Sequence, residues 1–255
     1  MAILSFRALA LWLLGYPEAA LTDLAQALKN AREIGQATTL MYALLHTTMF
    51  VHIPRGSYAS ATPALEEVIA LADEKGAPFV KALAMLNQAW ILTLTGKASD
   101  AIQVFNSWIT AYRSTGSTIY GPLHLSVLAR VKAELGEFDD AWRSMGETMM
   151  AIETTNEKWF EAEANRIAGQ ITPLSPEPNA AKAQAYFERA LEIARRQQAK
   201  SWELRAAMSM ARPWRDQGKR TEARDLLAPI YGIFTQGFDT RDLKEAKALL
   251  DALSL

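Results

Sequence analysis

The sequence predicts an all-α protein built from about six helix pairs that repeat every 40 residues or so, closed by a C-terminal capping helix. The first observation is a column of alanines at intervals of 41, 40, 40, 42 and 40 residues. The column contains Ala20, Ala61, Ala101, Ala141, Ala183 and Ala223. A constant interval of this size indicates stacked supersecondary units. No stretch alternates apolar and polar residues as a half-buried strand would.

Two further columns share the period. One is small at every position except Met49 and contains Ala8, Met49, Ala89, Ala129, Gly169 and Ala211. The other holds turn residues and contains Gly15, Gly56, Gly96, Gly136, Pro178 and Gly218. Each period therefore divides into a first helix, a turn and a second helix, called helix A and helix B below.

The first unit sets the pattern for the others. Helix A runs to Leu14, Gly15 and Pro17 form the turn, and helix B extends from about Glu18 to Ile34. Proline suits an opening helical turn because that turn leaves its N–H unused. Gly35 ends helix B, and the same position recurs at Gly76, Gly116 and Asn156. Glycine and asparagine are the residues that most readily adopt the left-handed conformation beyond a helix.

The last two units vary this pattern. Two prolines lengthen the turn before a helix B predicted over residues 180–198, and Pro213 falls inside helix A of unit six, where it should kink the helix. A final helix from Arg241 to Leu253 is apolar on one side and charged on the other, as a cap requires. We predict one solenoid domain over 1–255 with units at about 1–35, 36–76, 77–116, 117–156, 157–199 and 200–238, and a cap at 239–255.

The alanine column has a physical reason. Helices that pack 8–10 Å apart leave little more than a methyl group of room where they cross. A larger residue there costs about 1–3 kcal/mol through overpacking. Larger apolar residues fill the space around each crossing, in a column of Leu24, Leu65, Phe105, Met145, Phe187 and Leu227.

Composition excludes several classes of protein. Half of the 255 residues are hydrophobic, the net charge is −1 and there is no cysteine, so disulfide frameworks, thiolate metal sites and cysteine nucleophiles are excluded. The absence of cysteine agrees with a cytoplasmic protein, which is the location we expect. The apolar N-terminus lacks a basic leader and carries Arg7, so we interpret it as the first helix of the array.

Some stretches resemble a known family. Gly136-Glu-Phe-Asp-Asp-Ala141 and Gly218-Lys-Arg-Thr-Glu-Ala223 look like the turn and helix-B start of tetratricopeptide repeats (TPRs), although the period is about 40 rather than 34. The stretch from Arg195 to Leu250 resembles the C-terminal region of bacterial fusion proteins that join a class III nucleotide cyclase, an NTP-switch ATPase and such repeats. The resemblance implies a right-handed superhelix and a role in nucleotide signalling. It carries no catalytic residue to this chain.

No catalytic or metal motif is found. The sequence contains no glycine-rich phosphate loop, no GxSxG and no HExxH. His46 and His52 are six residues apart, on different faces of one helix, and His124 is remote in sequence. Adjacent acidic residues are explained by solvation and by helix dipoles. We therefore expect no enzyme activity, no cofactor and no metal.

We expect a partner to bind the concave side, which helix A would line with its positions 2, 5 and 9. The candidate contacts are His46, Phe50, Trp90, Arg130, Glu163, Arg166, Gln170, Arg205 and Arg212. This lining changes from apolar to arginine-rich, which favours a protein or peptide with an apolar end and an acidic end. The alternative is that Phe50 and Trp90 are core residues and that the arginines are solvated or paired internally.

Two other functions stay open. Helix A of unit one exposes an apolar face with Ile3, Phe6 and Leu9, which indicates an interface with upstream domains or with a second copy. The segment from Arg195 to Arg224 is the most basic of the chain and would suit nucleic acid, but the overall charge is balanced. Our leading hypothesis is a binding scaffold, the sensor or partner-binding region of a larger signalling protein. The rival is a stand-alone structural protein that self-associates.

Overall fold

The computed structural model describes residues 2–254, which form helices and turns and no strand. The all-helical prediction is confirmed. Contacts between Cα atoms divide the described residues into two compact units, one of residues 2–12 and 17–119 and the other of residues 13–16 and 120–254. Successive helices pack as neighbours within each unit, which is the arrangement of a helical repeat.

The first unit contains the helices up to residue 114. They are α1 (Ala2–Leu13), α2 (Pro17–Ile34), α3 (Ala37–Thr47), the π-helix η1 (Thr48–His52), α4 (Ile53–Arg55), α5 (Tyr58–Glu74), α6 (Pro78–Leu94) and α7 (Ala98–Ser114). Helix α3 packs on α2, α5 and α6, and α6 packs on α5 and α7. Helices α3 and α6, which are the A helices of their pairs, therefore each lie between the helix B before them and the helix B after them.

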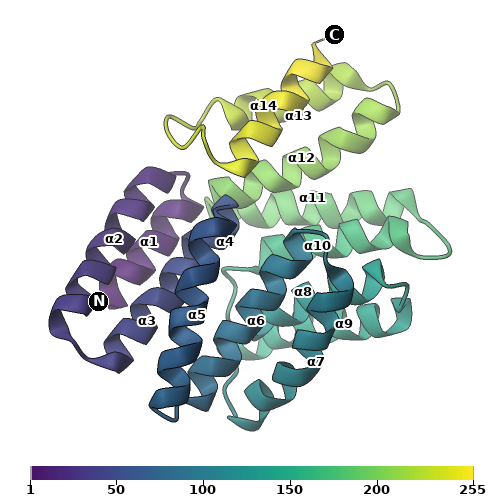
Figure 1. Ribbon diagram of the computed structural model, residues 1–255. Coiled ribbons are helices and arrows are strands. Elements are labelled where there is room, and N and C mark those ends of the chain that lie inside the picture. Colours follow the sequence, from purple (N-terminus) through teal and green to yellow (C-terminus); the bar gives the residue numbers. More distant parts are fainter. Residues whose placement is uncertain (1, 255) are drawn as a thin grey trace. The chain divides into compact units, whose positions relative to one another are not determined.

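The second unit repeats the arrangement three times and ends in the cap (Figure 1). Its helices are α8 (Gly121–Glu134), α9 (Phe138–Thr155), α10 (Glu161–Ile171), the 3-10 turn η2 (Thr172–Leu174), α11 (Ala180–Arg196), α12 (Lys200–Asp216), α13 (Arg220–Tyr231) and α14 (Arg241–Leu253). Helix α10 packs on α8, α12 on α10, and α14 on α12. These four helices form an inner layer, with α9, α11 and α13 outside it.

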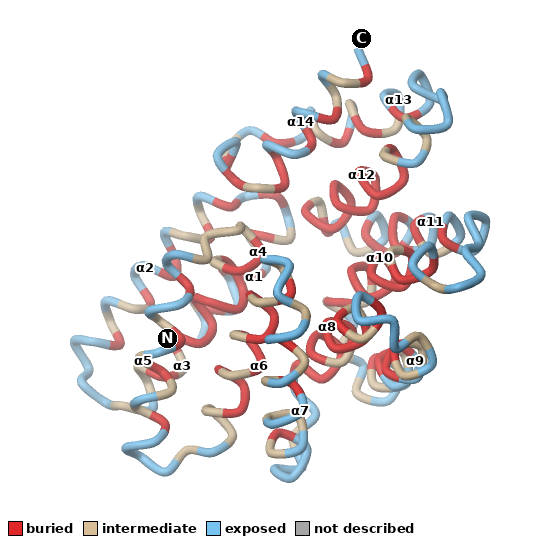
Figure 2. Tube along the Cα trace, turned by 45° about the vertical axis from the view of Figure 1, so that its right-hand side comes forward, coloured by how far each residue is buried: buried red, intermediate tan, exposed pale blue. Residues whose placement is uncertain are grey.

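Burial follows the two layers. Residues Ala162–Gly169 of α10 and Ser201–Ala211 of α12 are buried without interruption, whereas α11 and α13 alternate between buried and exposed residues (Figure 2). A helix that is buried on all sides lies inside a stack, and one that is buried on a single stripe covers it.

The alanine column occupies equivalent places in six helices. Each of its members is the fourth residue of a helix B, from Ala20 in α2 to Ala223 in α13. Ala183 is 7% exposed and the other five are fully buried. The large apolar column around the crossings, from Leu24 to Leu227, is buried as well. The period read from the sequence is therefore the period of the helix pairs.

The small column of helix A is buried as well, and Gly169 shows why one of its members must be small. A Cβ atom placed on Gly169 of α10 would come within 2.6 Å of Cδ1 in the ring of Phe187 on α11, so only glycine fits there. Met49 is the exception in sequence and in structure, because it lies in the π-helical turn η1. A π-helical turn holds more residues than an α-helical one, and here it coincides with the one large side chain of the column.

The predicted turn residues have the expected backbone. Gly35, Gly76, Gly116 and Asn156 all have positive φ, as do the glycines of the A–B turns. After Gly96, for example, the Lys97 N–H donates to the Leu92 carbonyl at 2.9 Å, the long bond that closes a helix C-terminus. Gln198 is also left-handed, at φ 56°, although the sequence did not single it out.

Helix bounds agree with the sequence where the signals were strong. The cap was predicted over Arg241–Leu253 and α14 has these bounds, with Leu243, Ala246 and Leu249 buried. Pro213 lies inside α12 as predicted. None of the helices formed by residues 2–254 combines the length and the apolar character that a transmembrane span needs.

Candidate functional site

A groove of about 690 Å³ opens in the second unit between the ends of α8, α10 and α12 and the start of α11. Its walls are mainly apolar and its few polar groups come from the inner helices. The lining residues are Arg130, Glu134, Gln170, Ile171, Pro173, Leu174, Ala180, Ala181, Ala183, Gln184, Phe187, Ser209, Met210, Arg212, Pro213, Trp214 and Gln217. Concave, mostly apolar sites of 300–1,000 Å³ with a few polar groups are typical of ligand pockets.

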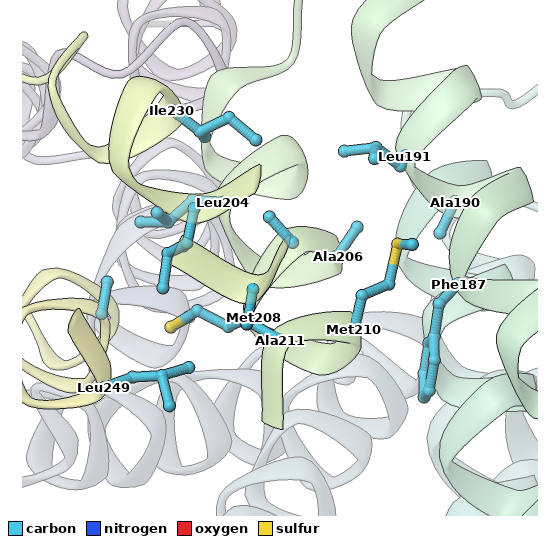
Figure 3. Packing of buried hydrophobic residues seen from close by; sticks show 14 of the residues in the cluster. Phe187, Ala190, Leu191, Leu204, Ala206, Met208, Met210, Ala211, Ile230 and Leu249 are labelled. Atoms are coloured by element: carbon cyan, nitrogen blue, oxygen red, sulfur yellow. The ribbon is translucent and has the colours of Figure 1, made fainter. Parts of the chain in front are cut away.

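The apolar floor comes from the core of the unit. Phe187 of α11 and Met210 of α12 belong to the buried cluster that also holds Leu191 and Leu204 (Figure 3). The floor is therefore rigid, because its side chains are packed against the neighbouring helices on their far side. Trp214, half-buried beside this cluster, extends the apolar surface toward the end of α12.

Two arginines provide the positive charge of the groove. The Arg130 Nε donates to Glu134 Oε1 at 2.8 Å, and the side chains are 29% and 25% exposed. An Arg212 terminal nitrogen donates to Glu245 Oε2 at 2.6 Å, with exposures of 39% and 46%. Glu245 is outside the groove lining. Ion pairs as exposed as these contribute about 0.2–1 kcal/mol each, so an incoming carboxylate can replace either acidic partner at little cost.

Gln170 supplies an acceptor on the helix between the two arginines. The Gln170 side-chain oxygen is buried and has no hydrogen-bond partner among the described residues. Buried polar atoms are almost always hydrogen-bonded in folded proteins. This oxygen therefore favours a ligand that carries an N–H group.

Three of the nine candidate contacts line this groove. Arg130, Gln170 and Arg212 hold the same position, the third predicted contact, on α8, α10 and α12. The sequence identified these residues through the repeat period, since equivalent positions of stacked helices lie side by side. It did not identify Phe187 of α11 and Met210 of α12 as the floor of a groove, nor the contributions of η2 and Trp214 to its walls.

Three other candidates are buried in a network of charges. Glu163 accepts from Arg166 Nε at 2.7 Å and from an Arg205 terminal nitrogen at 3.2 Å, and Arg205 Nε donates to Asp242 Oδ2 at 2.5 Å. These residues are at most 9% exposed. The network joins α10, α12 and α14, and its arginines are paired internally, as the alternative interpretation of the sequence expected.

Burial and charge act in opposite directions on Glu163. Burial alone would raise its pKa, but the charges of Arg166 and Arg205 and their hydrogen bonds outweigh burial and lower the pKa to about 2. For Arg205, burial lowers the pKa, but Asp242 and Glu163 raise it above its usual value. Both groups are therefore charged at neutral pH, and removing one member would leave an unpaired buried charge at a cost of about 3–5 kcal/mol.

The first unit holds the remaining candidates in its interior. His46 is 3% exposed, Phe50 is fully buried and Trp90 is 5% exposed, so they are core residues of α3, η1 and α6. The His46 ring lies 4.9 Å from that of Phe50 and 5.8 Å from that of Phe6. A partner that contacts these three residues in a groove stays a prediction.

The predicted N-terminal interface is partly exposed. Ile3 is 81% exposed and Phe6 48%, whereas Leu9 is 8% exposed and belongs to the core. Phe6 also packs on Phe50, with 5.9 Å between the ring centroids. The exposed apolar surface of α1 is therefore carried by Ile3 and part of Phe6.

Several arginines of the basic segment have acidic partners. Arg195 pairs with Glu203, Arg205 with Asp242, and Arg215 with Asp216. No group of three or more histidine, aspartate or glutamate side chains among residues 2–254 is placed to hold a metal ion. Comparison of the chain with models of protein families and with curated proteins finds no match.

The buried histidines predict a pH dependence of stability. The ordinary pKa of histidine is about 6.5. Burial lowers the pKa of His46 to about 4, because it outweighs the opposing hydrogen bond to the Tyr42 carbonyl. Burial also lowers the pKa of His124, to about 3. The unfolded chain therefore binds more protons between pH 6.5 and 4. The free energy of unfolding should therefore decrease as the pH is lowered through this range. The decrease should approach about 1.4 kcal/mol per pH unit for each histidine.

Urea unfolding at pH 7.5, 6.5, 5.5 and 5 measures this slope. The His46→Gln variant should lose a substantial part of the dependence, because one of the imidazoles whose pKa is lowered by burial is gone; His52 and His124 remain. A slope that is the same in the variant and the parent would contradict the assignment.

Proposed function

We propose that this chain is a non-catalytic scaffold that binds a protein or peptide partner through the groove of its second unit. The observation that carries the proposal is the combination of a packed apolar floor with two replaceable arginine pairs in one cleft of about 690 Å³. Arginine, tryptophan and tyrosine are the residues that most often anchor partners, and the groove offers Arg130, Arg212 and Trp214. A partner with apolar and acidic residues fits both features.

We also infer the finer fold and setting from the sequence resemblance. In this proposal the helix pairs are TPR-like and wind as a right-handed superhelix, and the chain acts in the cytoplasm as the sensor or partner-binding region of a larger bacterial nucleotide-signalling protein. The order of packing in the second unit supports the stacking of helix pairs, since each inner helix packs on the inner helix of the next pair, whereas the TPR assignment and the right-handed sense rest on the sequence resemblance. The signalling role rests on the resemblance of residues 195–250.

Peptide display tests the groove directly. A random 12-residue peptide library selected on the full chain should yield clones that combine apolar and acidic residues. The Ala181→Trp variant should lose binding to these clones, because Ala181 is an exposed residue of the groove lining and the indole would fill the cleft.

The matched control is Ala185→Trp, one turn further along α11, exposed and outside the lining. It should bind the clones as the parent does. Equal loss in both variants, or in neither, would rule out the groove as the binding site.

Self-association is the alternative that a specific observation favours. Ile3 and Phe6 present apolar surface on α1, and such surface marks an interface when it is contiguous. Light scattering on the parent should then give the mass of an oligomer, and the Phe6→Glu variant that of a monomer. A monomer in both samples excludes this alternative.

Nucleic-acid binding is the weakest of the candidate functions. The arginines of the basic segment that pair with acids are not available as a continuous positive surface. A basic face that is free of acidic partners is what phosphate binding requires.

A further inference from the structure

The two arginines of the groove lie on helices that are not neighbours. Arg130 is near the end of α8 and Arg212 near the end of α12, and α10 packs between these two helices. Packed helix axes are about 8–10 Å apart. Arg130 and Arg212 are therefore separated by about two helix spacings, or roughly 16–20 Å.

This separation corresponds to a definite length of peptide. An extended chain advances about 3.3–3.6 Å per residue, so about five residues span the distance between the two helices that carry the arginines. A helix advances only about 1.5 Å per residue and would need more than ten residues for the same span. A short ligand reaches both arginines only if it is extended.

An acceptor of the groove supports the same conformation. The Gln170 side-chain oxygen, on the helix between the two arginines, has no hydrogen-bond partner among the described residues. An extended peptide has free backbone N–H groups, whereas a helical peptide uses most of its own internally. The apolar floor at Phe187 and Met210 receives a side chain from the middle of such a segment.

We propose that the groove binds a short extended peptide segment that carries two acidic residues about five positions apart and an apolar residue between them. This inference rests on the proposed function and specifies its partner. Glu134 and Glu245 hold the arginines in the unliganded chain, and the two acidic residues of the segment replace them.

A pair of synthetic peptides tests the spacing. The probe is acetyl-Gly-Asp-Ser-Leu-Phe-Ser-Asp-Gly-amide, and the control, acetyl-Gly-Asp-Asp-Leu-Phe-Ser-Ser-Gly-amide, has the same composition and charge. Titration calorimetry on the full chain should give a dissociation constant up to about fivefold lower for the probe, because only the probe can place a carboxylate on each arginine.

Variants of the arginines assign the contacts. Arg130→Gln and Arg212→Gln should each reduce the affinity for the probe up to about fivefold. In each variant, replacing the aspartate that contacted the lost arginine by asparagine should cause no further loss of affinity. The control is Arg189→Gln, an exposed arginine of α11 outside the groove that should bind the probe as the parent does.

The outcomes separate this inference from the proposed function. Equal affinity for the two peptides, with both lost in Ala181→Trp, would overturn the spacing and leave the groove as a peptide site. Two results would overturn the groove itself. One is that the Ala181→Trp variant still binds both peptides. The other is that the chain binds neither peptide and that the display clones bind Ala181→Trp as well as the parent.

Discussion

The structure depends on the close contact where helices A and B of each pair cross. In each pair a buried alanine is the fourth residue of helix B, and a buried position of helix A with the same period is small in five of the six pairs. Contacts of this kind fix the distance between the helices, because packed interiors tolerate neither voids nor overlap. Once the distance is fixed, the same crossing repeated every 40 residues places equivalent residues of successive pairs side by side.

The functional features of the second unit follow from that constraint. Inner helices enclosed by neighbours must pair any charge they carry, and Glu163, Arg205 and Asp242 do so across three helices. Near the ends of the inner helices the neighbouring helices no longer cover every side chain. Arg130 and Arg212 are therefore partly exposed in the groove. The same register thus yields a buried, internally satisfied network in one part of the stack and a row of replaceable ion pairs in another.

The sequence predicted the helix pairs, the turn residues and the cap because these depend on local, periodic signals such as Gly35, Gly76 and Ala141. It predicted the position of Arg130, Gln170 and Arg212 from the same period. It could not tell which charged residues of an inner helix are enclosed, since that depends on the helices on either side. The division into two compact units and the π-helical turn at Met49 also lacked a sequence signal, because both arise from packing between helices.

A double-mutant cycle at Gly169 and Phe187 tests the crossing contact most directly, because the two residues face each other across α10 and α11. Urea unfolding should show that Gly169→Ala destabilises the parent by about 1–3 kcal/mol through overlap with the ring. In a Phe187→Leu background the same change should cost much less, since the ring is gone. Equal costs in both backgrounds would contradict the account, because the two positions would then not meet.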